Sequence, residues 1–241
     1  MNRLLIKLGA WLFFGLVASL VLTWHFAFRH PVRNLLPLPP DLVALGSPAG
    51  QAYLAESEYV ADFQALSHSF VPQIRREFSG VATAVTVLNA LFAPAAPLTQ
   101  VTFFTDPVRR VRSSVRVSLS GMSLIHLRDA LREHGAAANA TYASASDLES
   151  FRSLAKENLG REGDYLVVDY ARGVLRQRGA GNIAPAAAYH APSDRILVLD
   201  AAIANYPPVW VRTDSLWRAM EATDGHAPFG RGFVVVQEPS H

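Results

Sequence analysis

The order of helical and extended patterns along this chain predicts an α+β fold. Apolar spacing typical of helices dominates the first part of the chain, and strand-like runs gather in the second. The chain has 241 residues, 50% hydrophobic and 17% charged, which suits one folded domain with an additional apolar segment. Because helices precede strands, we expect an antiparallel sheet and a functional site in the cleft between the helical and the sheet half.

The additional apolar segment lies at the N-terminus. Residues 8–24 are uncharged and apolar, and Phe26 and Phe28 extend the run to the roughly 20 residues that a membrane span needs. No good small-residue cleavage site follows, so we predict that residues 1–30 form an uncleaved signal-anchor, with a cleaved signal peptide as the alternative. Basic residues flank the run on both sides, which leaves orientation undecided.

Such a segment usually exports the domain attached to it, so we expect the domain outside the cytoplasm, as in a bacterial periplasm, or secreted if the segment is cleaved. Five prolines within residues 31–50 predict an extended linker. The folded domain is then expected to comprise residues 51–241.

The helices expected in the domain follow from periodicity and capping residues. Residues 78–92 are apolar nearly all round, which predicts a buried helix. Ser123 and Gly135 bound a helix over 123–134, and Gly160 ends another over 147–159. The remaining helical patterns are 52–70, with mixed polarity, and 213–222, capped by Thr213 or Asp214.

The strands are expected mainly after residue 160. Residues 164–170 are a buried strand by composition, and a turn over 190–194 separates the next two. The full set of expected extended segments is 97–104, 108–117, 164–170, 183–189, 195–199 and 231–237.

Composition excludes several function classes. A net charge of +2 gives no indication of a nucleic-acid partner, and the arginines between 109 and 116 are interpreted as a solvated face. The chain contains no Cys, which excludes disulfides, Cys-ligated zinc, iron–sulfur clusters and a thiol nucleophile. We predict no metal site and no cofactor.

One stretch has the layout of an active site. Gln73 stands six residues before Ser79, a small residue of the nucleophile type, and Gly80 and an apolar helix come next. In papain-type proteases a Gln so placed helps to form the oxyanion hole, and the nucleophile opens the helix. The alternative role for Ser79 is that of helix N-cap, with its hydroxyl accepting a backbone N–H.

Four segments in order carry a more specific resemblance. They are Ser79-Gly80 through Leu91, Tyr170 through Gly181, Pro185 through Asp200, and Tyr206-Pro-Pro-Val-Trp210 through Arg231-Gly-Phe233. Together they resemble the catalytic domain of phytochelatin synthases, papain-like enzymes that use glutathione. The resemblance implies a papain-like fold for the domain.

The resemblance also implies roles for site residues. In the family a Cys attacks the peptide bond before the glycine of glutathione, a His activates it and an Asp orients the His. Ser79 occupies the Cys position, Asn182 the His position and Asp200 the Asp position, while Gln73 matches the oxyanion-hole residue. We therefore expect Asn182 to hydrogen-bond Asp200 as the His would.

Substrate contacts match the resemblance only in part. Gly181 and Tyr206 are candidate substrate-binding residues, whereas Ile203 replaces a basic residue that plant members use. The expected ligand is glutathione or a γ-glutamyl peptide, including its metal thiolates, through which the family responds to heavy metals. Plant forms add a Cys-rich C-terminal domain, so without Cys this chain is not expected to bind a soft metal itself.

The substitutions predict a pseudoenzyme. A serine hydroxyl depends on a base, and the Asn182 amide cannot accept its proton. One alternative is a slow Ser-dependent amidase or transferase with a recruited base. His68 is the candidate because it lies a few residues before Gln73, whereas His190 is expected to face solvent. The other is a non-catalytic binding protein of the cell envelope.

Overall fold

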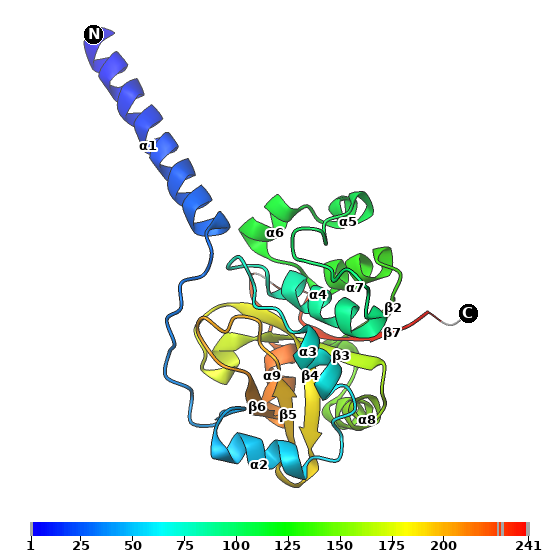
Figure 1. Cartoon of the computed structure of the whole chain (residues 1–241). Coiled ribbons are helices and arrows are strands. Elements are labelled where there is room, and N and C mark those ends of the chain that lie inside the picture. Colours follow the sequence, from blue (N-terminus) through cyan, green and yellow to red (C-terminus); the bar gives the residue numbers. More distant parts are fainter. Residues whose placement is uncertain (1, 226, 228, 240–241) are drawn as a thin grey trace.

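The core of the protein is one antiparallel sheet (Figure 1). The computed structural model describes residues 2–225, 227 and 229–239. The strand order is β1-β6-β5-β4-β3-β7-β2, and every neighbouring pair is antiparallel. The strands are β1 (Val43–Ala44), β2 (Ala137–Tyr142), β3 (Asp164–Ala171), β4 (Gly181–His190), β5 (Arg195–Val198), β6 (Val209–Arg212) and β7 (Gly232–Gln237).

Helices pack on both faces of this sheet, which confirms the α+β prediction. One core joins the sheet to α3, α4 and α7, and a second joins its other face to α8 and α9. The helices are α1 (Asn2–Phe28), α2 (Pro48–Glu56), α3 (Phe63–Ser69), α4 (Ser79–Phe92), α5 (Asp106–Val111), α6 (Ser114–Ser120), α7 (Leu124–Glu133), α8 (Leu148–Leu159) and α9 (Thr213–Glu221).

Strand β4 contributes to both cores, as the two-residue period of a strand requires. Ile183 and Ala187 face the core that contains α4, whereas Ala184 and Ala186 face the core of α8 and α9. Helix α4 is buried from Gly80 to Leu88, as its apolar composition predicted. The start of α4 and the start of β4 are thereby brought together in the interior.

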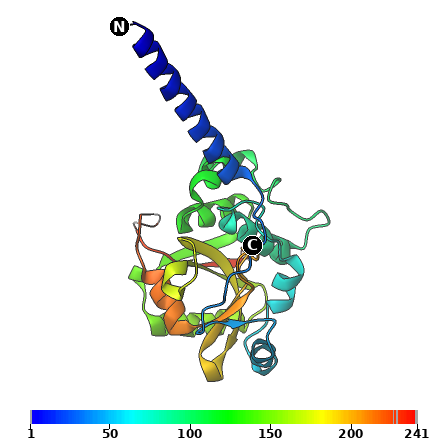
Figure 2. The same ribbon diagram turned by 90° about the vertical axis from the view of Figure 1, so that its left-hand side faces the viewer.

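Helix α1 projects from the domain (Figures 1 and 2). Its window Trp11–Phe28 is long and apolar enough to cross a membrane and is not buried in the protein, although a signal sequence has the same properties. The segment after α1 is held on the domain. Asn34 and Leu36 donate backbone hydrogen bonds to the carbonyls of Ala204 and Asn205, and β1 pairs with β6.

Several local predictions hold and others do not. Ser123 caps α7 in a capping box with His126, and Asp147 caps α8. Residues 108–117 are not extended, because Pro107 at the start of α5 and the Ser113 cap of α6 favour two short helices. Helix α9 begins at Thr213, as predicted, but its N-cap is Arg212 and not the predicted Thr213 or Asp214.

Candidate active site

Ser79 is the first residue of α4 and its side chain reaches the sheet. The residue preceding the helix is Phe78, which makes no side-chain cap, so the predicted N-cap role of Ser79 is wrong. Instead, the Ser79 hydroxyl accepts a hydrogen bond from the backbone N–H of Ile183 on β4, at 3.4 Å. Ser79 therefore lies directly against the strand that carries Asn182.

Two further contacts fix α4 against β4. The Thr83 hydroxyl donates to the carbonyl of Ile183 at 2.9 Å. A Cβ atom added at Gly80 would lie 3.2 Å from Ile183 Cδ1 and from Met122 Cβ, so glycine permits the close approach of helix and strand. The start of α4 is thus held in one position relative to residues 182 and 183.

Asn182 takes part in a buried hydrogen-bond network. Its amide nitrogen donates to the hydroxyl of Tyr170 at 3.1 Å, and that hydroxyl donates to Asp200 Oδ2 at 3.3 Å. Asn182 and Tyr170 are paired across β4 and β3. The expected direct bond from Asn182 to Asp200 is wrong, because the Tyr170 hydroxyl lies between the two side chains.

Asp200 is fully buried and accepts hydrogen bonds on both oxygens. Arg172 donates to Oδ2 at 2.6 Å, and the backbone N–H of Ala202 donates to Oδ1 at 2.7 Å. Burial, followed by the charge of Asp200, raises the pKa of Tyr170 above its ordinary value. The Tyr170 hydroxyl therefore keeps its proton and acts as a donor to Asp200 at neutral pH.

Gln73 lies beside the loop that comes after Asp200. Its backbone N–H donates to the carbonyl of Ala201 at 3.0 Å, and its side-chain nitrogen donates to the carbonyl of Arg76 at 2.8 Å. Its side-chain oxygen is buried and has no hydrogen-bond partner in the described structure. The fold brings Gln73 to the predicted region, with one amide hydrogen engaged by its own loop.

The candidate substrate residues have different surroundings. Gly181 is exposed, and a Cβ atom there would lie 3.2 Å from the guanidinium of Arg231. Tyr206 is buried, its hydroxyl accepts the backbone N–H of Arg178 at 2.9 Å, and its ring lies under Arg172. Tyr206 thus supports the loop that leads into β4.

Sequence reasoning missed a second buried arginine cluster next to the site. The Arg231 guanidinium lies 3.6 Å from Asp169 and 2.8 Å from Asp224. Burial raises the pKa of Asp169 to about 7, although Arg231 opposes the shift. The available signal was Asp169 itself, a carboxylate within the buried run of β3, which needs a partner.

The expectation that His190 faces solvent is wrong. Its side chain is buried, its ring stacks on Tyr53 at 4.7 Å, and its nitrogens contact Ser193 at 2.7 Å and Glu56 at 3.2 Å. His68 is exposed near the end of α3. Among the described residues, no histidine hydrogen-bonds the Ser79 hydroxyl.

Fold and site together define an α+β domain in which the Ser79 hydroxyl, at the start of a buried helix, is bonded to the backbone of β4. The preceding residue of that strand, Asn182, belongs to a buried network with Tyr170, Asp200 and Arg172. Comparison with known proteins identifies the domain further. The chain belongs to the phytochelatin synthase family, whose family model matches residues 34–233. The family resemblance predicted from the four segments is thereby confirmed.

Curated relatives of this chain include plant proteins named glutathione gamma-glutamylcysteinyltransferase. Protein 1 of Lotus japonicus is 29% identical over 224 residues, which cover 86% of this chain and 42% of the relative. Protein 1 of Triticum aestivum is 30% identical over 220 residues, covering 86% and 43%, and protein 1 of Arabidopsis thaliana is 28% identical over 225 residues, covering 86% and 44%. The chain spans less than half the length of these relatives.

Proposed function

We propose that this protein is a papain-like member of its family that binds glutathione or a γ-glutamyl peptide and turns it over slowly or not at all. The family pattern assigns the nucleophile, base and orienting positions to Ser79, Asn182 and Asp200. The observation that carries the proposal is the environment of the Ser79 hydroxyl: its hydrogen bond in the described structure comes from the backbone N–H of Ile183, and Asn182, which precedes Ile183 on β4, uses its amide nitrogen to donate to Tyr170.

The chemistry of these groups argues against efficient acyl transfer. A serine hydroxyl must lose its proton as it attacks, and a neighbouring base must receive that proton. The nitrogen of an amide side chain cannot do so. Loss of a triad in another hydrolase lowers turnover by about 10⁶-fold, which indicates the scale of the expected deficit.

The groups that shape the site nevertheless support ligand binding. The buried network of Tyr170, Arg172 and Asp200 holds the base position in a fixed geometry. The N-terminus of α4 presents backbone N–H groups and a positive dipole end near Ser79, which favour a carbonyl or carboxylate oxygen. The same frame that would have oriented a catalytic base can therefore still hold a peptide.

The test of turnover is glycine release from glutathione by the full-length chain, with and without cadmium. We expect the wild type to release little glycine and the double variant Ser79→Cys with Asn182→His to release orders of magnitude more. The two single variants are matched controls, because each restores only half of the nucleophile–base pair. Wild-type release equal to that of the double variant would overturn the proposal.

Binding needs a separate measurement. Isothermal titration calorimetry of the wild type with glutathione should detect binding, and Gln73→Ala should weaken it. Gln64→Ala, on the exposed surface of α3, is the matched control. No heat of binding in any variant would favour a non-catalytic envelope protein with another ligand. Glycine release that Ser79→Ala abolishes would favour a serine-dependent amidase.

We further propose that residues 1–30 anchor the domain to a membrane, with the domain of residues 51–241 outside the cytoplasm. Support comes from the length, composition and exposure of α1. Carbonate extraction of membranes tests the anchor, since a peripheral or cleaved protein would be released. Protease protection in sealed cells and spheroplasts tests the side on which the domain lies.

A further inference from the structure

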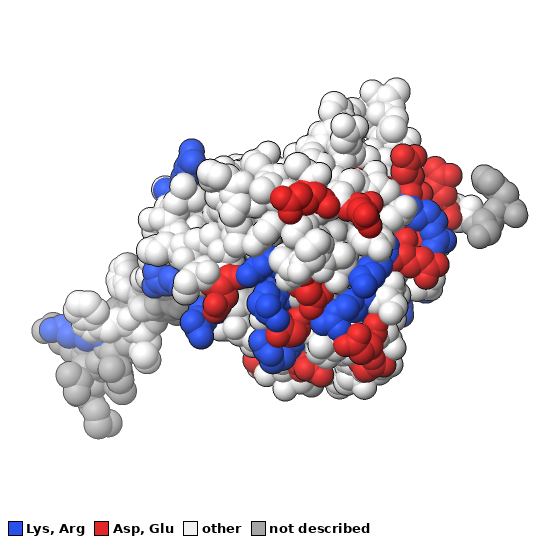
Figure 3. Space-filling view, turned by 90° about the horizontal axis from the view of Figure 1, so that it is seen from below, with Lys and Arg blue, Asp and Glu red and all other residues white. Residues whose placement is uncertain are grey.

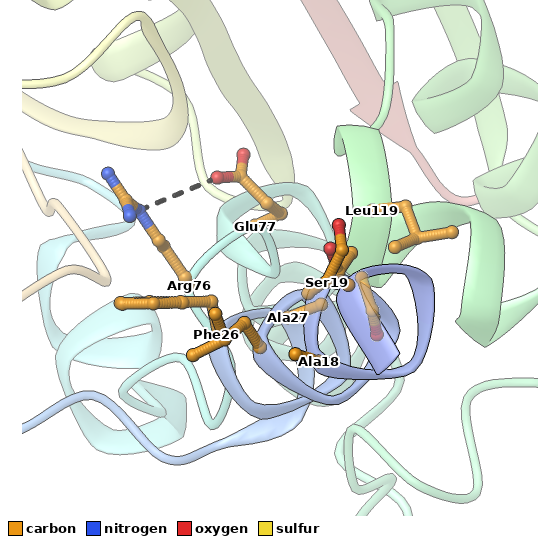
Figure 4. Close-up of a pocket in the computed structure, with 11 residues that line it drawn as sticks. Ala18, Ser19, Phe26, Ala27, Arg76, Glu77 and Leu119 are labelled. Atoms are coloured by element: carbon orange, nitrogen blue, oxygen red, sulfur yellow. Dashed lines mark ion pairs between the residues drawn. The ribbon is translucent and has the colours of Figure 1, made fainter. Parts of the chain in front are cut away.

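The C-terminal part of α1 lies beside the domain, close to α6 and the loop 75–77. A cleft of about 570 Å³ separates the two and is lined by α1 residues between Gly15 and Ala27 on one side (Figure 4). Arg76, Glu77, Ser118 and Leu119 line the other side. Close to the end of α1, the Arg75 guanidinium lies 4.9 Å from the centre of the Phe28 ring.

This packing has a consequence for an inserted α1. The stretch from Gly15 to Ala27 measures about 18 Å along the helix axis, which is more than half the thickness of a bilayer core. If α1 spans a membrane, the parts of the domain beside this stretch cannot stay clear of the lipid. These parts are the loop 75–77 and helix α6.

The outward face of α6 has the composition that such a position requires. Val115 and Leu119 are 48% and 53% exposed and lie one helical turn apart. Arg116 and Ser120 continue the same exposed face, whereas Val117 and Ser118 face the interior. Apolar side chains beside a basic one are typical of interfacial helices.

Charge around this face is predominantly basic. Between residues 101 and 121 there are four arginines, of which Arg109, Arg110 and Arg116 are exposed, and one acidic residue, Asp106. In the described part of the chain, neither Arg110 nor Arg116 has an ion-pair partner within 4.0 Å. Helices α5 and α6 lie on the same side of the domain as α1 (Figure 1).

The opposite side of the domain differs. Seen from below, acidic and basic side chains are interspersed (Figure 3). On and beside α8 they form ion pairs, for example Arg152 with Glu149 and Asp194, and Arg161 with Glu157. A surface with both signs in pairs has no net attraction for an anionic layer, whereas the α5–α6 side does.

We propose that the α5–α6 surface, defined by Arg109, Arg110, Val115, Arg116 and Leu119, docks on the anionic phospholipid headgroups of the bilayer that holds α1. The leucine and valine enter the interface and the arginines pair with lipid phosphates. The loop 75–77, which leads into Ser79, then lies at the membrane surface. This inference rests on the proposed membrane anchor and is independent of the proposed glutathione binding.

The test uses the full chain in lipid nanodiscs and exploits the absence of native Cys. Leu119→Cys receives an environment-sensitive fluorophore, and Glu157→Cys on α8 is the matched control. Nanodiscs contain either phosphatidylcholine alone or a mixture with phosphatidylglycerol, together with a headgroup-level nitroxide quencher. We expect a blue shift and strong quenching at residue 119, greater in the anionic discs, and neither at residue 157.

Charge removal provides the second arm. Arg110→Gln with Arg116→Gln should lower the docked fraction at residue 119 by roughly fivefold for each arginine removed. Arg212→Gln with Arg218→Gln removes the same charge from the end of β6 and from α9 and should change nothing. If α1 is inserted in the membrane but the probe at residue 119 is as exposed to solvent as the probe at residue 157, the docking proposal is overturned. Release of the chain by carbonate would contradict the anchor and the docking together, and calorimetric glutathione binding would be unaffected in either case.

Discussion

Two buried arginine–aspartate pairs flank the same strand, β3, and they differ in how completely they are satisfied. Asp200 receives Arg172 at 2.6 Å together with the Tyr170 hydroxyl and the Ala202 N–H. Asp169 lies 3.6 Å from Arg231, and burial raises its pKa to about 7. The difference shows that Asp200 has hydrogen-bond donors on both oxygens, although Asn182 reaches it only through the Tyr170 hydroxyl.

The largest loss of stability is expected when one member of the fully hydrogen-bonded Arg172–Asp200 pair is removed. Arg172→Ala should lower the free energy of unfolding by about 3–5 kcal/mol, because it leaves the Asp200 charge buried without its partner. Urea unfolding followed by circular dichroism measures the loss. Arg212→Ala, which breaks an exposed pair with Asp214, should cost less than about 1 kcal/mol. Equal losses in the two variants would refute the distinction.

The raised pKa of Asp169, in the second pair, should make the stability of the protein depend on pH. A carboxyl whose pKa rises from 3.8 to about 7 on folding is most stabilising below 3.8, and its contribution falls as pH rises through 7. The free energy of unfolding of Asp169→Asn, relative to wild type, should therefore rise across this window by on the order of 1.4 kcal/mol per pH unit. Denaturant titrations at several pH values measure it.

Asp62 sharpens the pH prediction. The pKa of Asp62 is raised to about 6, first by burial. The free energy of unfolding of Asp62→Asn relative to wild type should therefore also rise with pH, and it should reach its plateau at a lower pH than that of Asp169→Asn. Asp214, whose pKa is lowered chiefly through Arg212 despite burial, is the control of opposite sign. A flat difference for Asp169→Asn would show that Arg231 keeps this carboxyl ionised at its ordinary pKa.

An intermediate effect is expected at the hydroxyl that joins Asn182 to Asp200. Tyr170→Phe leaves the Asn182 amide without its acceptor in the interior and should cost about 1–3 kcal/mol. Tyr142→Phe, at a half-buried position of β2, is the matched control and should be nearly neutral. Thermal unfolding followed by circular dichroism distinguishes them, and an equally neutral Tyr170→Phe would mean that the network does not stabilise the fold.

The smallest effect is expected at the helix–strand junction. Gly80→Ala adds a methyl group 3.2 Å from Ile183 and Met122, and the resulting crowding is partly offset by the better helix propensity of Ala. A net loss of about 1 kcal/mol is expected. Gly173→Ala, where the added atom meets nothing within 4 Å, is the control. A stabilised Gly80→Ala would show that the junction relaxes freely.

The sequence was sufficient for elements whose signals are local. The caps at Ser123 and Asp147 and the apolar run of β3 specify their helices and strand without reference to the rest of the chain. Strand β2 was missed because its three alanines give it weak strand character. It forms a strand because it pairs with β7, which lies almost a hundred positions further along the chain, and no local pattern indicates that pairing.

For the site, too, the sequence was sufficient to locate residues but not to predict their contacts. The resemblance located Ser79, Asn182 and Asp200, and the fold brings all three into one region. The position of the Tyr170 hydroxyl between Asn182 and Asp200 depends on the register of β3 against β4, which no local pattern specifies. His190 was placed wrongly for a related reason: Tyr53 and Glu56, which cover it, are more than 130 residues earlier in the chain.

The attachment of the segment after α1 has a mechanical consequence. Asn34 and Leu36 are bonded to Ala204 and Asn205, only a few residues beyond Asp200. Tension or rotation applied through α1 would therefore load this loop before it reached the rest of the sheet. The chain between residues 29 and 33 can change length without that load, whereas movement of residues 34–36 passes through these two hydrogen bonds to the loop that follows Asp200.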